Sequence, residues 1–218
     1  MNRVLPLFVF AIIFSQSINA QTSDPKDSAW KKGGTFNFQF NQVALSNWQA
    51  GGENSVSGNA IVNLFANYEK GKWTWNNALT LAYGLNHQGS TFIKTDDRIE
   101  LESRVDRAIN KKWGASALLN FRTQFADGFS SPEDSLRIST FLAPAYTLLG
   151  LGVTYKPNKK FSAFISPATT KLTLVNDQRL ANLGAFGVDA AVRAGDSATG
   201  AIITEGSKTR WEIGGYAN

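Results

Sequence analysis

Hydrophobic and polar side chains alternate at every second position along most of this chain, and this alternation restricts it to β structure. In residues 35–43, Phe36, Phe38 and Phe40 share one face of a strand, whereas Asn37 and Gln39 share the other. A period of two is the pattern of a half-buried strand, while an amphipathic helix repeats about every 3.6 residues. No helical stripe of useful length follows the N-terminal residues. The sequence therefore predicts an all-β fold.

About eight segments show this alternation, each of roughly the ten residues expected of an outer-membrane strand. They are residues 35–43, 59–68, 73–83, 98–107, 113–125, 141–155, 161–166 and 209–218. Short turns at residues 69–72, 110–112 and 156–160 alternate with longer loops at residues 44–57, 85–97, 126–137 and 171–208. Short turns on one rim and long loops on the other are typical of outer-membrane barrels, whose short turns are periplasmic. Residues 171–208 could form an extracellular loop, a short extra hairpin or an inserted plug.

The distribution of charge favours a membrane barrel over a soluble barrel or sandwich, in which residues would also alternate. Every lysine is expected outside the strand cores, in turns, loops or the N-terminal lead. A lysine in the middle of a lipid-facing surface costs ~2–4 kcal/mol, so such a surface excludes it. The opposite faces are rich in Asn, Thr, Ser and Gly, as the wall of a polar lumen would be. We therefore predict an antiparallel up-and-down transmembrane β-barrel.

Aromatic residues mark the two ends of the predicted strands. Tyr68, Trp73, Trp113, Tyr155 and Phe161 adjoin the short turns, and Tyr83, Phe125 and Phe141 stand near the opposite ends. The distance from Trp73 to Tyr83 along a tilted strand corresponds to about 25 Å of membrane thickness. Two aromatic belts at that spacing are expected at the two interfaces of a bilayer.

The N-terminal residues indicate export. Arg3 precedes an apolar run and a polar tail, which together are typical of a secretory signal peptide cleaved after Ala20. An uncleaved N-terminal anchor is the alternative. The expected organisation is a signal peptide at residues 1–20, a polar lead at 21–33 and the barrel domain at 34–218, located in the cell outer membrane. The chain has no cysteine, so the fold must form without disulfides.

His87 is the only histidine and lies in the predicted loop 85–97 with Ser90, Asp96 and Asp97. This set could act in an outer-membrane hydrolase or acyltransferase only if the serine, the base and the carboxylate met by folding. No G-x-S-x-G turn supports that chemistry. We expect no catalytic residues and no enzyme activity, and an enzyme with a rim site at His87 remains the alternative.

Metal and nucleic-acid binding are also not expected. Asp96, Asp97, Glu100 and Glu102 could gather a calcium ion, but Arg98 interrupts them and no EF-hand spacing exists. A salt-bridged lumen wall is the better interpretation of these residues, with Glu100, Glu102 and Arg122 facing the lumen. Leu79 and Leu119 should face lipid. We expect no metal-binding or cofactor-binding residues and no cofactor, and outer-membrane lipid rather than nucleic acid as the partner.

Several strings in combination resemble one known family. They are residues 47–57 (NWQAGGENSVS), 94–97 (KTDD), 123–125 (TQF), 141–146 (FLAPAY), 152–161 (GVTYKPNKKF), 166–175 (SPATTKLTLV) and 184–188 (GAFGV). The pattern is similar to the domain-of-unknown-function family 3078 of Bacteroidota, which implies an outer-membrane-barrel-like fold and no known activity. Family members continue beyond the position of Asn218, so the resemblance also implies a C-terminally incomplete barrel.

The function expected from these features is that of a passive or structural outer-membrane protein. It would be a narrow pore, or a module that binds a partner through its long loops. Besides the enzyme with a site at His87, a soluble periplasmic β-barrel that binds an apolar ligand is the other alternative.

Overall fold

The strands form one antiparallel sheet that follows the order of the chain. A computed structural model describes residues 28–45, 52–131, 134–158, 160–195 and 200–218, so the predicted signal peptide at residues 1–20 lies outside the described part. The eight strands are β1 (Trp30–Val43), β2 (Ser55–Lys70), β3 (Trp73–Gln88), β4 (Thr91–Ala108), β5 (Trp113–Thr123), β8 (Ala145–Asn158), β9 (Phe161–Leu174) and β12 (Thr209–Ala217). The predicted all-β antiparallel fold is confirmed.

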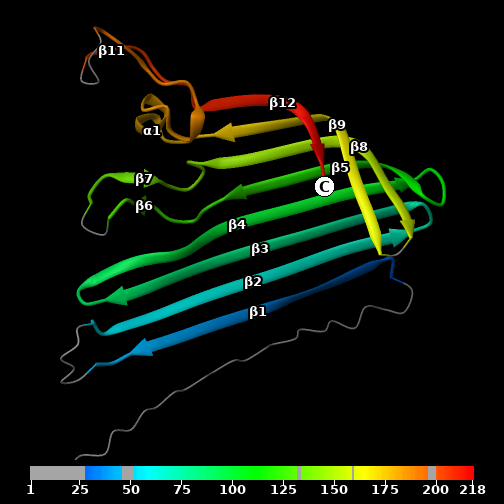
Figure 1. Ribbon diagram of the computed structural model, residues 1–218, viewed down its shortest axis with the longest axis horizontal. Helices are drawn as coiled ribbons and strands as arrows, with labels where there is room; N and C mark the ends of the chain where they lie inside the picture. The colour runs from blue at the N-terminus through cyan, green and yellow to red at the C-terminus, as the bar shows by residue number, and fades with distance from the viewer. Residues whose placement is uncertain (1–27, 46–51, 132–133, 159, 196–199) are drawn as a thin grey trace, which may run out of the picture.

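The sheet is open in the part of the chain that the structure describes. β1 and β12 are its two edges, and they lie on opposite sides of the molecule (Figure 1). β1 begins at Trp30, inside the predicted polar lead at residues 21–33. The reason is aromatic packing: the Trp30 ring lies 5.2 Å from Tyr68 and 5.6 Å from Trp75, measured between centroids.

The prediction of a long loop at residues 85–97 is wrong. β3 continues to Gln88 and β4 begins at Thr91, so only a tight turn at Gly89 and Ser90 joins them. Gly89 has a φ of 59°, the left-handed conformation that tight hairpin turns require. The pairing shifts by one residue between Gly84 and Leu85. This bulge shifts the alternation of polar and apolar residues by one position. The alternation therefore does not reveal that β3 and β4 continue beyond it.

Two of the long connections contain small elements of their own. Between β5 and β8, β6 (Gly128–Phe129) pairs with β7 (Arg137–Ser139). After β9 come α1 (Gln178–Asn182), the 3₁₀ turn η1 (Ala185–Gly187) and the hairpin of β10 (Val192–Arg193) with β11 (Ile202–Thr204). Of the three alternatives for residues 171–208, an extra hairpin is therefore present. No helix among the described residues is long and apolar enough to cross a membrane.

A packed cluster of buried apolar side chains lies in these connections, whereas Ala82, Ala145 and Phe164 are buried within the sheet strands. Its members are Ala143, Val175, Leu180, Ala181 and Val188. Asp177 caps α1 by accepting a hydrogen bond from the amide of Leu180, and its carboxylate also pairs with Arg137 at 2.8 Å. Burial by itself raises the pKa of Asp177, but the Leu180 amide and the Arg137 guanidinium outweigh it and hold that pKa below its ordinary value. We call this unit the loop-end core.

Candidate functional site

The two faces of the sheet differ in chemistry, and the strand register shows which residues belong to each. Side chains directly opposite one another on paired strands share a face. Thr74, Asp106 and Ser116 form one such row, on what we call the polar face. Trp75, Val105 and Ala117 form the neighbouring row, on what we call the apolar face.

Large side chains on the apolar face are exposed along most of the sheet. Exposure reaches 64% for Leu151 and 88% for Ile213. More than a third of the surface is exposed for Phe36, Phe38, Phe40, Val56, Leu64, Trp73, Trp75, Tyr83, Trp113, Leu149, Leu151, Val153, Phe161, Ile165, Trp211 and Ile213. Single exposed apolar residues are ordinary, but a contiguous face of them marks a contact surface for lipid, protein or ligand.

The polar face buries hydroxyl groups and a carboxylate. Asp106 on β4 accepts hydrogen bonds from Ser116 Oγ on β5 at 2.5 Å and from Thr154 Oγ1 on β8 at 2.8 Å. Its other oxygen lies 3.2 Å from Arg104 Nε and 3.9 Å from Lys156 Nζ. Asp106, Ser116 and Thr154 are all buried. Because Asp106 and Thr154 belong to strands separated by β5, their contact shows that the sheet curves toward its polar face here.

The predicted charged wall is present, with one difference. Glu100 pairs with Arg122 across β4 and β5 at 3.1 Å, and Arg98 lies 3.9 Å from Glu100. The register places Glu102 on the same face, opposite Asn120, whereas Leu79 and Leu119 lie on the apolar face. Glu102 has no ion pair among the described residues, because Arg104 is engaged by Asp106 instead.

Six described lysines lie within strands: Lys31, Lys32, Lys70 and Lys156 lie near strand ends, and Lys94 and Lys171 lie further inside, contrary to the prediction. Lys94 lies within β4 and pairs with Asp97, and Lys171 lies within β9 and pairs with Glu212 at 3.1 Å. The register places Lys171 opposite Glu212, on the polar face. The ion pair with Glu212 on the polar face explains why Lys171 is accommodated inside β9. Lys94 lies opposite Leu85 near the loop end of β4, where Asp97 neutralises its charge. The central apolar face of the described strands still carries no lysine.

The structure does not assemble the Ser–His–carboxylate set. His87 lies on β3 rather than in a loop, and its ring packs on Phe92 with centroids 4.4 Å apart. Asp97 accepts hydrogen bonds from the amides of Phe125 and Ala126, and Asp96 lies 3.4 Å from Arg98 Nε. Within the described residues, His87 has no hydrogen bond to Ser90 or to either aspartate.

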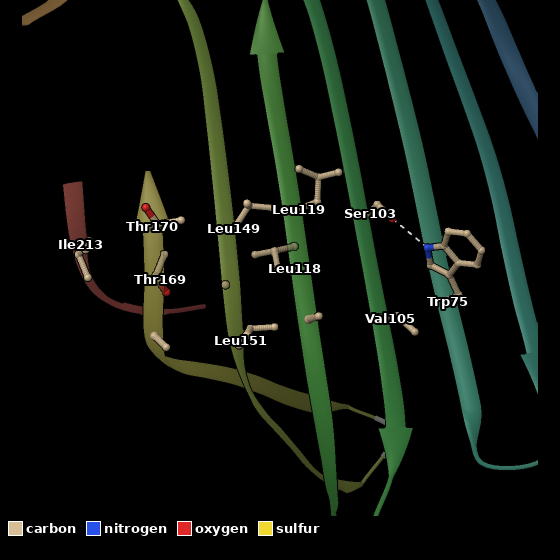
Figure 2. Close-up of a pocket in the computed structure, with 13 residues that line it drawn as sticks. Trp75, Ser103, Val105, Leu118, Leu119, Leu149, Leu151, Thr169, Thr170 and Ile213 are labelled. Atoms are coloured by element: carbon tan, nitrogen blue, oxygen red, sulfur yellow. Dashed lines mark hydrogen bonds between the residues drawn. The ribbon is translucent and has the colours of Figure 1, made fainter. Parts of the chain in front are cut away.

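A cavity of about 750 Å³ lies on the apolar face. It crosses the sheet in two paired rows, with Trp75 from β3 at one end and Ile213 from β12 at the other (Figure 2). The small side chains of Ala117 and Ala168 leave room for the cavity, and Leu119, Leu149 and Leu151 border it. The indole N–H of Trp75 donates to Ser103 Oγ at 2.8 Å, and Ser103 donates to Asn77 at 2.7 Å. The cavity lining contains no charged side chain. The one indole N–H in the lining already has a hydrogen-bond partner, Ser103.

Sequence reasoning did not find this cavity. It depends on which small residues meet across neighbouring strands, and alternation alone does not give the register. The same holds for Arg107, which the register places opposite Trp73 on the apolar face. Its guanidinium carbon lies 5.6 Å from the centre of the Trp73 ring.

These features define a class: an antiparallel β-meander with one exposed apolar face and one polar face that is buried around Asp106. Residues 40–129, from the end of β1 to β6, match the model of a family described as protein of unknown function (DUF3078). The resemblance predicted from the motifs is thereby confirmed over this stretch. No curated protein and no solved structure matches the chain.

Proposed function

We propose that this chain is an outer-membrane protein whose strands form the wall of a transmembrane β-barrel, and that its role is passive or structural. The apolar face contacts lipid and the polar face lines a narrow lumen. One observation carries the proposal: large apolar side chains are exposed while hydroxyls and a carboxylate are buried. A protein in water has the opposite arrangement.

The magnitude of the exposure supports a covered face. Burial of a large apolar side chain contributes ~1.5–3 kcal/mol, so a half-exposed one forgoes roughly 1 kcal/mol. Summed over the exposed residues of the apolar face, the loss is of the order of the whole stability of a domain, ~5–15 kcal/mol. Lipid covers such a face over its full extent. The fully buried apolar cluster lies in the loop-end core, where the proposal places water.

The edges of the sheet must be paired in the membrane, because each unsatisfied backbone group in hydrocarbon costs several kcal/mol. β1 and β12 are the edges of an even-numbered antiparallel sheet, so they run in opposite directions. An even number of strands is also the rule for single-chain bacterial barrels. Closure through these edges, directly or through further strands, gives the barrel.

The polar face supports a narrow or filled lumen rather than a wide channel. The network of Asp106, Ser116 and Thr154 leaves little room between β4 and β8. The pair of Glu100 with Arg122 adds charge beside it. A passive role as a tight pore, or as a scaffold for partner-binding loops, fits a wall of mutually satisfied groups.

Fractionation tests this proposal. We expect the protein expressed with its own N-terminal residues to stay in the outer-membrane pellet after washes with alkaline carbonate and with high salt. Detergent should release it. A known periplasmic protein in the same cells serves as the control for complete washing.

The second candidate is a soluble periplasmic β-protein that binds an apolar ligand, which the cavity on the apolar face favours. Release of the protein by carbonate or salt without detergent would support that candidate and contradict the membrane proposal.

A further inference from the structure

The cavity on the apolar face lies beside a side chain of that face that suits an anion, Arg107. Along β4, Ser103, Val105 and Arg107 share the apolar face, and the first two line the cavity. Arg107 is the next residue toward the short turn that follows Ala108. A cation therefore lies directly next to an uncharged apolar cavity.

Arg107 has no carboxylate partner among the described residues. Its guanidinium lies over the ring of Trp73. The neighbouring Asp106 lies on the opposite face, where Arg104 and Lys156 pair with it. Stacking on an indole holds the planar guanidinium while leaving its N–H groups free to donate. These donors suit a phosphate, which arginine binds through parallel hydrogen bonds.

The depth of Arg107 agrees with a lipid headgroup. Trp73, Trp113 and Tyr155 lie at the same short-turn end of the sheet, and the rings of Trp113 and Tyr155 stand 4.6 Å apart. Amphipathic rings sit at the headgroup level of a bilayer. The cavity begins one row of side chains further from the short turns, at Val105, and crosses the sheet there, where an acyl chain would lie.

We propose that the apolar face carries a phospholipid site, with one acyl chain in the cavity and the phosphate on Arg107. The proposal rests on the membrane location proposed above and adds a specific ligand to it. The volume of about 750 Å³ lies within the range of small-molecule sites. The uncharged, mostly apolar lining suits an acyl chain, and the positive charge of Arg107 complements the phosphate.

Retained lipid measures the site directly. The detergent-purified full chain is incubated with vesicles of dioleoyl phosphatidylglycerol, separated by size exclusion, and its bound lipid is quantified by mass spectrometry. We expect phosphatidylglycerol to co-elute with the protein. Dioleoylglycerol, which has the same acyl chains and no phosphate, should be retained about tenfold less, the loss expected for a charge-assisted hydrogen bond.

Two substitutions separate the two halves of the site, each with a matched control. Ala117→Trp fills the cavity, whereas Ala60→Trp makes the same change on the same face at β2, outside the lining. Arg107→Gln removes the guanidinium, and Arg107→Lys keeps the charge. Lys32→Gln is the control, because Lys32 also lies over an aromatic ring of the apolar face, that of Trp30 on β1, away from the cavity. We expect both site variants to lose phosphatidylglycerol, both controls to retain it, and Arg107→Lys to retain an intermediate amount.

Retention equal to wild type in either Ala117→Trp or Arg107→Gln would overturn the phospholipid site. Carbonate resistance is measured on every variant. A variant that stays in the membrane pellet and retains lipid normally contradicts only the phospholipid site, whereas release of the wild-type chain by carbonate contradicts the membrane proposal itself.

Discussion

At the scale of single residues, Asp106 is the side chain that joins most elements of the polar face. It brings together β4, β5 and β8 through two hydroxyls, with Arg104 and Lys156 close to its second oxygen. A buried charge with this many partners stabilises the fold mainly because its removal leaves those partners unsatisfied.

Asp106→Asn should therefore lower the free energy of unfolding by about 2–3 kcal/mol, because Arg104 and Lys156 lose their counter-charge. Urea titration of the detergent-solubilised protein, followed by tryptophan fluorescence, measures the change. Glu102→Gln is the matched control, since Glu102 lies on the same strand and face without an ion pair and should change stability little. Equal effects of the two substitutions would show that the network contributes nothing specific.

The prediction of individual side chains from the sequence was uneven for a physical reason. The pair of Glu100 with Arg122 was predictable because alternation assigns each residue to a face and opposite charges on adjacent strands attract. The partner of Asp106 on β8 was not, because Thr154 reaches it only through the curvature of the sheet. His87 was misplaced because the bulge at Gly84 hides the extension of β3 and β4.

At the scale of elements, the close approach of β8 to β9 requires a glycine at position 152. A Cβ added to Gly152 would lie 2.0 Å from the carbonyl oxygen of Ile165, where the pairing of these strands shifts register. That contact is with backbone, which a rotamer change cannot relieve. Gly214 on β12 offers a contrast, because a Cβ there meets nothing within 4 Å.

Gly152→Ala should consequently disrupt the β8–β9 hairpin and cost about 1–3 kcal/mol or more, as overpacking does. The yield of folded protein in the outer-membrane fraction, together with resistance to added protease, measures this. Gly214→Ala should leave both unchanged. A Gly152→Ala protein with wild-type yield and protease resistance would mean that β9 packs differently at this bulge.

At the scale of the whole molecule, the sequence predicted the number, order and direction of the main strands, and the sheet confirms them. It also predicted a closed barrel, which the open sheet of the described residues does not show. Strand order follows because strands that are consecutive in the chain usually pair, whether a short turn or a long loop joins them. Closure depends on how the two edges meet, and β1 and β12 share no sequence feature that reports it. The apolar cavity was equally hidden, since it depends on Ala117 and Ala168 meeting Leu151 across strands.

The molecule as a whole is therefore defined by its two faces, and the central claim is that the apolar face meets lipid while the polar face does not. The chain contains no cysteine, so a single engineered thiol reports one position without background. Leu79 and Leu119 test the apolar face, and Glu100 and Glu102 test the polar face.

Labelling of these single-cysteine variants in intact membranes tests the claim most directly. A thiol reagent confined to the lipid phase should modify cysteines at positions 79 and 119 and spare those at positions 100 and 102. Lipid-phase labelling at position 100 or 102, or its absence at both 79 and 119, would contradict the proposed orientation of the sheet.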